Sequence, residues 1–259
     1  MTDLAVLGSQ DVDAREWLDD VERVELPAKG KAVPAVKGRL AGHELIVLPR
    51  NSSGRPRPPH SIDYRTNIEA LAAAGVTKVL STAMVGTLRT SLPVGSMMLV
   101  DQFIDFTKDR QFTFFGDDEF GFADMTEPYC PALREQLLEA ADRIAVPMAP
   151  TGCYVGVPGP RFETRAEVRM YGLLGGDVIG HTGTTDAILA REAGMCFATV
   201  AGVITLGAGL SDHRMNANHW HGSRREHAAR FRRIVAELTG KLGTGPSACG
   251  CAESAPIEK

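Results

Sequence analysis

The sequence has no long hydrophobic run and no excess of basic residues. No stretch of 18 consecutive apolar residues occurs, so we expect no membrane-spanning helix. The first twenty residues begin with acidic character and lack the apolar core of a secretory signal, which predicts a cytoplasmic location. The formal net charge is −4, whereas nucleic-acid-binding proteins usually carry a basic face. We therefore expect neither a membrane nor a nucleic acid as a partner.

Cysteine is also sparse. The chain contains five cysteines, too few and too scattered for a disulfide framework. Cys130, Cys153 and Cys196 have apolar or small neighbours, which predicts buried thiols. Cys249 and Cys251 form a C-x-C pair near the C-terminus, and the sequence around them offers no second pair of metal ligands. We therefore predict no metal site and a poorly ordered C-terminal tail.

Alternating strand and helix patterns predict an α/β domain built on one central sheet. The segment 101–106 follows the fourth predicted strand, and residues 49–61 and 106–127 are expected to be long loops. Strands are predicted at residues 3–8, 44–48, 77–81, 96–100, 151–157, 177–180 and 196–205, and helices at 64–74, 131–144, 164–174, 185–193 and 224–242.

Two segments have features that suit an anion. The first predicted strand runs into Gly8-Ser9, a turn that can present backbone N–H groups and a hydroxyl. Arg50 follows another strand and begins a loop rich in Arg and Pro. A guanidinium is a common phosphate ligand, but each feature also has an ordinary structural explanation, as a common turn or a solvated arginine.

Two further segments lie between a strand and a helix. Phe162 is suited to stack on an aromatic ring, and Glu163 can accept an N–H from a base edge or stabilise the N-terminus of the helix that follows. Thr182 can bind an oxyanion or cap its helix. Ligands in α/β folds usually bind where strand ends converge, so we expect these segments to be close together.

The segments PHSIDYRTNIEAL, VGTLR, VDQFIDFTKDRQFTFF, GPRFETRAE and GGDVIGHTG resemble, in order and spacing, the methylthioadenosine phosphorylases and the trimeric purine nucleoside phosphorylases. The resemblance extends from about residue 3 to about residue 210. It implies a single domain at residues 1–243, with a mixed central β-sheet (a distorted barrel) surrounded by helices, and a tail at 244–259. It further implies a homotrimer with active sites near the subunit boundaries.

Members of this family cleave a nucleoside with phosphate, giving a free base and a pentose 1-phosphate. The resemblance therefore implies inorganic phosphate as co-substrate and no metal or organic cofactor. The ribose becomes cation-like in the transition state, and the departing base gains negative charge that the protein must stabilise.

The phosphate-binding motifs are only partly retained. The family's N-terminal phosphate turn appears as Gly8-Ser9-Gln10, which keeps a hydroxyl but loses the second glycine. The family's Arg-His-Gly loop appears as Arg50-Asn51-Ser52. The resemblance therefore assigns phosphate binding to four residues: Ser9, Arg50, Asn51 and Thr182.

The nucleoside-binding motifs depart further from the family pattern. His181 replaces the methionine that contacts the ribose, and Met84 and Val85 occupy a turn that is usually smaller and more polar. Thr205 occupies the position of the Asp or Asn that contacts the base, and Gly207 that of the second Asp of adenine-type enzymes. We therefore predict Thr205, Glu163 and His181 as catalytic residues. The residues predicted to bind the nucleoside are Met84, Val85, Phe162, Glu163, His181, Thr205 and Gly207.

The base remains open at this point. Phosphorolysis of 5′-methylthioadenosine or a related 5′-modified purine nucleoside is the first hypothesis. Glu163 and the Gly207–Gly209 segment favour the alternative, a 6-oxopurine phosphorylase acting on inosine, guanosine or methylthioinosine. The eroded phosphate motifs leave three further hypotheses: a specialised secondary-metabolism enzyme for a modified base, a nucleoside hydrolase and a non-catalytic nucleoside binder. The histidine-rich stretch at 211–227 is read as a solvated loop, a pocket lid or a metal site.

Overall fold

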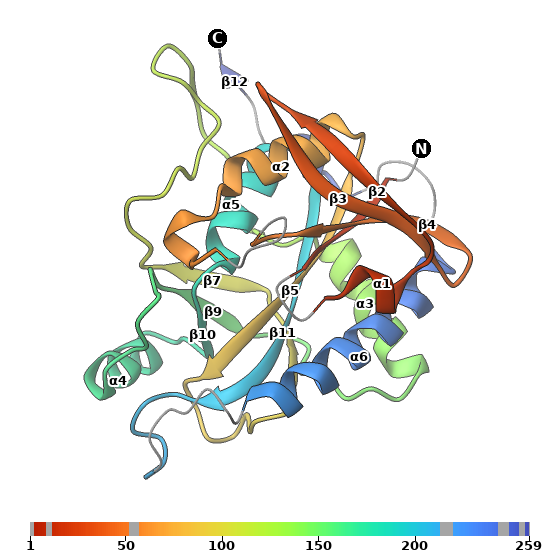
Figure 1. The fold of residues 1–259 in the computed structure, drawn as a ribbon. Helices are drawn as coiled ribbons and strands as arrows, with labels where there is room; N and C mark the ends of the chain where they lie inside the picture. Colours follow the sequence, from red (N-terminus) through yellow and green to blue (C-terminus); the bar gives the residue numbers. More distant parts are fainter. Residues whose placement is uncertain are drawn as a thin grey trace.

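The central element of the fold is the long strand β5 (Lys78–Thr87), of which every residue except Met84 is buried. The computed structural model describes residues 3–8, 12–51, 57–212, 220–242, 249–253 and 257–258. β1 (Leu4–Gly8) pairs parallel with the first half of β5, and β10 (Val178–Gly180) pairs antiparallel with its end. β11 (Cys196–Leu206) runs parallel along the other edge, so β5 is enclosed by strands (Figure 1).

The sheet closes on itself as a distorted barrel, as predicted. β11 pairs with β6 (Met97–Leu99), and the chain continues directly into β7 (Gln102–Asp105). β7 pairs with β9 (Cys153–Gly156), and β9 pairs with β10, which returns to β5. The pairings are both parallel and antiparallel, so the predicted mixed sheet is confirmed.

The sequence pattern did not predict a β-hairpin that the structure contains. β2 (Asp19–Ala28) and β3 (Lys31–Leu40) pair antiparallel and extend the sheet through β4 (His43–Pro49) to β1. Most side chains of β2 are exposed, so the strand lacks the apolar pattern that predicts burial. Gly30, with φ of +69°, provides the left-handed residue of the connecting turn.

Helices cover the sheet on two sides. α2 (Tyr64–Ala73) and α5 (Gly183–Glu192) pack on each other and on one hydrophobic cluster, whereas α3 (Pro131–Arg143) and α6 (Trp220–Thr239) pack on another. α4 (Arg165–Leu173) lies at the periphery (Figure 1), and α1 (Ala14–Trp17) is a single turn. None of the helices in the described ranges is both long and apolar enough to span a bilayer.

The remaining elements are short. β12 (Ile257–Glu258) pairs with β8 (Phe120–Gly121), which lies within the predicted loop 106–127. Within the described ranges, 3₁₀ turns occur at Pro59–Ser61 and Cys251–Glu253. Within the C-terminal segment, Cys251 is only 1% exposed and packs in the cluster of α3 and α6.

Candidate active site

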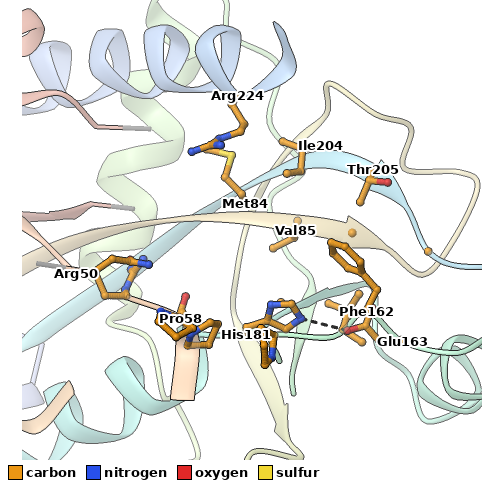
Figure 2. Close-up of a pocket in the computed structure, with 18 of the residues that line it drawn as sticks. Arg50, Pro58, Met84, Val85, Phe162, Glu163, His181, Ile204, Thr205 and Arg224 are labelled. Atoms are coloured by element: carbon orange, nitrogen blue, oxygen red, sulfur yellow. Dashed lines mark hydrogen bonds and ion pairs between the residues drawn. The ribbon is translucent and has the colours of Figure 1, made fainter. Parts of the chain in front are cut away.

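A cavity of about 480 Å³ opens where β5 and β11 end, beside the segments that follow β4, β9 and β10. β5 and β11 are parallel, so their carboxyl ends meet at one edge, the usual position of a ligand site in this class of fold. The side chains come from both sides of this opening (Figure 2). The lining residues are Arg50, Asn51, Arg57, Pro58, Pro59, Met84, Val85, Gly86, Pro160, Phe162, Glu163, Ile179, Gly180, His181, Thr182, Ile204, Thr205, Leu206, Gly207 and Arg224.

Every described residue that the sequence predicted for the site lines this one cavity. Ser9, the remaining predicted phosphate ligand, lies outside the described residues. The residues brought together come from five separate segments of the chain, which explains why their sequence positions alone did not define a pocket. They are Arg50, Asn51, Met84, Val85, Phe162, Glu163, His181, Thr182, Thr205 and Gly207.

Arg50 is a buried cation held by protein acceptors. Its Nε donates to Asp186 Oδ2 over 2.5 Å, and its Nη2 donates to Ser81 Oγ over 2.6 Å. Burial alone would lower the pKa of Arg50, but the charge and hydrogen bond of Asp186 outweigh it and raise the pKa. Two weaker bonds to the carbonyls of Thr82 and Leu7 leave one of the five guanidinium N–H groups without an acceptor in the described structure. Arg50 is therefore a fixed charge in the cavity wall that has one N–H to offer.

Two more arginines line the cavity and were not predicted. Arg57 belongs to the Arg/Pro loop that follows Arg50, and Asn51 Nδ2 donates to its carbonyl over 3.1 Å. Arg224 projects from α6 beside Met84 (Figure 2). Among the described residues of the lining, the charged ones are three arginines and one acid, Glu163, so this part of the cavity favours an anionic ligand.

Thr182 precedes α5 but does not cap it. The structure shows no hydrogen bond from its hydroxyl to the helix backbone. Instead, the buried Tyr154 hydroxyl accepts from the backbone N–H groups of Gly183 and Thr182, over 3.2 and 3.4 Å. The helix-capping explanation of Thr182 is therefore wrong, and its side chain lines the cavity at the positive end of the α5 dipole.

Glu163 is likewise not needed for capping. Thr164 is the N-cap of α4, and Thr164 and Glu167 form a reciprocal capping box. The Glu163 side chain is 8% exposed, and its Oε1 lies 3.4 Å from His181 Nε2 (Figure 2). The capping hydrogen bonds of α4 are thus made without Glu163, and the tertiary structure places its carboxylate beside an imidazole in the cavity.

The turn before α4 fixes the position of the imidazole. Gly159 has φ of +61°, and a Cβ there would lie 2.9 Å from the His181 ring, so glycine permits the turn to pack directly on it. Phe162 is 40% exposed, and its ring centroid lies 6.3 Å from that of His181. An aromatic face is therefore available next to the polar pair.

A β-bulge shapes the opposite wall. The register between β5 and β11 shifts between Val203 and Thr205, and Ile204 and Thr205 both line the cavity. Bulges redirect side chains beside ligand sites in this way. A Cβ at Gly207 would lie 2.8 Å from the Thr87 carbonyl oxygen, so this position accepts no larger residue without a backbone shift.

Comparison with known proteins gives the family. The profile of the phosphorylase superfamily matches residues 4–239. The chain belongs to the phosphorylase superfamily. It is 37% identical over 241 residues to a probable 6-oxopurine nucleoside phosphorylase of Dictyoglomus turgidum, covering 92% of this chain and 91% of the relative. It is 31% identical to an S-methyl-5′-thioadenosine phosphorylase of Pyrococcus abyssi, covering 98% and 97%.

The fold agrees with this assignment. Methylthioadenosine phosphorylase from Schistosoma mansoni, solved in complex with adenine, superimposes with a TM-score of 0.90 at 25% identity and covers 98% of this chain and 96% of its own. Within the phosphorylase superfamily fold, sequence reasoning found one arginine of the cavity and missed Arg57 and Arg224. Both arginines lie in basic stretches of the sequence, Arg57 in the Arg/Pro loop and Arg224 at the start of the last predicted helix. Only the fold places the two in the wall of the cavity that Arg50 lines.

The cavity offers no metal site among the residues that the structure describes, since its His and Glu side chains form no group of three metal ligands. Part of the histidine-rich stretch lies within the described residues. His227 is 4% exposed on α6, so for this residue the solvated-loop and lid hypotheses are wrong. His213 and His219, and the side chain of His221, lie outside the described structure.

Proposed function

We propose that this protein cleaves 6-oxopurine nucleosides with inorganic phosphate, giving the free base and a pentose 1-phosphate. The observation that carries the choice of base is the buried carboxylate of Glu163 in the cavity wall, released from any capping role. Hypoxanthine and guanine present an N–H at the N1 edge, which a carboxylate accepts. Neutral adenine presents an acceptor there, which a carboxylate repels unless it is protonated.

We place the phosphate beside the positive charge of Arg50 and the start of α5. Arg50 supplies a fixed positive charge and one N–H, and the Thr182 hydroxyl at the start of α5 supplies a second donor. A phosphate oxygen attacks C1′ of the ribose as the bond from C1′ to the base breaks, and the electron pair of that bond leaves with the base. The arginines hold the dianion against the developing positive charge of the sugar.

The base end has weak proton donors. Glu163 accepts the N1–H. The Thr205 hydroxyl donates to the Leu206 carbonyl oxygen over 3.2 Å and has to turn from it to donate its one hydrogen bond to the departing base. Gly207 has no room for the second Asp of the adenine-type pattern, which supports a 6-oxopurine over 5′-methylthioadenosine. A neutral hydroxyl stabilises developing charge less well than an acid, so we expect turnover to be slow.

The comparisons support the same choice. The Dictyoglomus relative, named for 6-oxopurine nucleosides, is 37% identical, and the Pyrococcus relative, named for 5′-methylthioadenosine, is 31% identical. 5′-Methylthioadenosine stays the alternative substrate. A homotrimer is also part of this proposal, and apolar side chains exposed on α4 and at its C-cap support it: Met170, Leu173 and Leu174.

A nucleoside panel tests the proposal. The full-length protein is incubated with inosine, guanosine, methylthioinosine, adenosine and 5′-methylthioadenosine, with and without phosphate, and base release is followed by chromatography. We expect phosphate-dependent release of hypoxanthine or guanine. Release without phosphate would indicate a hydrolase, release of adenine alone would return the choice to 5′-methylthioadenosine, and no release would indicate a nucleoside binder.

Glu163→Gln tests the residue that carries the choice. Loss of a hydrogen bond to a charged group costs about 1.5–3 kcal/mol, so kcat/KM for inosine should fall roughly 10- to 100-fold. The fall for any residual adenosine activity should be much smaller. Glu135→Gln is the matched control, because Glu135 is exposed on α3 and lies outside the cavity. Equal losses on both nucleosides would show that Glu163 is structural.

A further inference from the structure

Four of the five cysteines converge on one point, away from the cavity. The Sγ atoms of Cys130, Cys196, Cys249 and Cys251 all lie within 4.8 Å of one another, and those of Cys196 and Cys249 are 3.3 Å apart. Cys130, Cys196 and Cys251 are buried, with exposed fractions of 1%, 6% and 1%. The C-terminal C-x-C pair thus meets a second pair that the sequence places more than fifty residues away.

The four residues come from three elements of one hydrophobic cluster. Cys130 is the N-cap of α3, and Cys196 is the first residue of β11. The segment Cys249–Glu253 packs beside the turn that precedes β11, where a Cβ on Gly194 would lie 3.3 Å from Ala252 Cα. The close approach at Gly194, whose φ is +69°, brings the C-x-C pair to the other two thiols.

Two N–H groups from outside the cluster donate to its sulfurs. Leu133 N–H donates to Cys130 Sγ over 3.4 Å at the N-terminus of α3, the positive end of the helix dipole. Arg191 Nη1 donates to Cys251 Sγ over 3.4 Å, and Arg191 is itself 8% exposed. Metal-bound thiolates are typically supported by such outer N–H donors, whereas neutral buried thiols do not need them.

We propose that Cys130, Cys196, Cys249 and Cys251 bind one Zn²⁺ as a structural tetrathiolate site. Four sulfurs around one Zn²⁺ at about 2.3 Å lie roughly 3.8 Å from one another, which is compatible with the observed spacing. A soft, four-sulfur, tetrahedral donor set selects zinc over hard cations such as Mg²⁺. The set has no open position, so the site is structural rather than catalytic.

The zinc would fix the C-terminal segment to the domain. It would join Cys249 and Cys251 to the starts of α3 and β11, elements that are distant in sequence. Cys196 and Thr205 are at opposite ends of β11, nine residues or about 30 Å apart, so the site is separate from the proposed active site. Failure of the zinc proposal therefore leaves the proposed nucleoside chemistry untouched.

The experiment is metal analysis of the full-length protein, purified without chelator and without a metal-affinity column. We expect about one zinc per chain in the wild type and a loss of at least about tenfold in the double variant Cys249→Ser/Cys251→Ser. These substitutions lie in the C-terminal segment, so the barrel should still fold. Cys153→Ser is the matched control, because Cys153 lies on β9 outside the cluster and its loss should leave zinc unchanged.

Two further measurements, zinc uptake and thiol counting, distinguish a zinc site from a disulfide or an empty cluster of thiols. Wild-type protein stripped of metal under reducing conditions should regain zinc on titration with Zn²⁺ alone, and the double variant should not. Thiol counting after denaturation, without reductant, should find all five cysteines as thiols. Zinc below about one tenth per chain with no uptake on titration, iron in its place, or thiols missing as disulfides would each overturn the proposal.

Discussion

At the scale of single residues, the site depends on Arg50 and Asp186, two charged side chains that folding removes from water. Arg50 and Asp186 are both fully buried at the side-chain level, so each requires the other. The pair fixes the guanidinium before any phosphate arrives. A preorganised charge loses little entropy on binding, which is how a cavity with eroded phosphate motifs can still hold an anion.

Asp186→Asn tests this pairing through stability. Removing one partner of a buried ion pair leaves an uncompensated charge, so we expect the free energy of unfolding to fall by about 3–5 kcal/mol. The measurement is equilibrium urea unfolding. The exposed Asp142 on α3 provides the control, since Asp142→Asn should change stability by less than about 0.5 kcal/mol. Equal effects of the two substitutions would contradict the role of the pair.

Thr182 gives a prediction for phosphate binding. Its hydroxyl makes no capping bond, so Thr182→Val should remove a ligand contact while keeping the shape of the residue. We expect the KM for phosphate to rise roughly 10- to 100-fold, as for a lost hydrogen bond to a charged group. Thr182→Ser keeps the hydroxyl and should remain near the wild-type value. A Val variant with unchanged phosphate KM would remove Thr182 from the site.

At the scale of elements, α6 is attached to the sheet through a buried histidine. His227 Nε2 lies 2.8 Å from Thr82 Oγ1 on β5, and its ring stacks on Phe231 with a centroid distance of 6.2 Å. Gly202 on β11 makes room for it, because a Cβ there would lie 2.3 Å from His227 Nδ1. Burial, helped by the charge of Arg230, lowers the pKa of His227 to about 4.

This shift predicts acid sensitivity. Unfolded His227 takes up a proton below its ordinary pKa of 6.5, whereas the folded residue does not until about pH 4. The free energy of unfolding therefore contains the full contribution of neutral His227 above pH 6.5. This contribution is lost as the pH falls from 6.5 to about 4, by roughly 3 kcal/mol in total. Urea unfolding at several pH values should show a shallower loss between pH 6.5 and 5 for His227→Gln. The exposed His43, changed to Gln, should leave the slope as in the wild type.

At the scale of the whole molecule, the surface suggests assembly. Leu173 is 88% exposed and Leu174 53% exposed at the C-terminal end of α4, the helix whose N-terminus follows the turn that carries Phe162 and Glu163. Apolar side chains exposed together are typical of a surface that a second subunit covers. The proposed trimer would thus place a neighbouring chain beside the cavity.

Light scattering coupled to size exclusion tests the assembly. We expect a mass of about three times the 27.8 kDa of one chain at micromolar concentration. Leu173→Glu should lower that mass if α4 belongs to the interface, because a charge buried between subunits is costly. Val94→Glu changes an apolar side chain that is likewise exposed but lies outside α4, and serves as the control. A wild-type mass of 27.8 kDa would contradict the trimer.

The sequence could predict the apolar elements because their periodicity reflects burial directly. β1, β4, β9, β11, α2 and α3 occur where the pattern placed them, to within a few residues. It could not predict the hairpin of β2 and β3, whose side chains are mostly exposed and whose pairing depends on long-range backbone hydrogen bonds. β5 extends to Thr87 because it is covered on both edges, and the sequence suggested an end at Ser81.

The candidate site divides in the same way. Motif resemblance to the phosphorylases pointed to Arg50, Glu163, His181, Thr182 and Thr205 from the residue types alone. Whether Thr182 caps a helix, and whether Glu163 stabilises a helix N-terminus or faces a ligand, was undecided, because both roles use the same residue type at the same position. The packing gives the N–H groups at the start of α5 to the Tyr154 hydroxyl and places Glu163 beside His181 in the cavity wall.

The sequence by itself determined the family, the α/β class and most of the residues around the cavity, since these follow from local patterns and motifs. Only the tertiary structure decided what depends on residues far apart in the chain. It placed Arg57 and Arg224 in the wall of the cavity that Arg50 also lines. It also placed Cys130 and Cys196 beside the C-x-C pair, although neither is near that pair in the sequence. The physical reason is that charge compensation and metal coordination require side-chain atoms within a few ångströms of one another. The separation of two residues along the chain does not determine that distance.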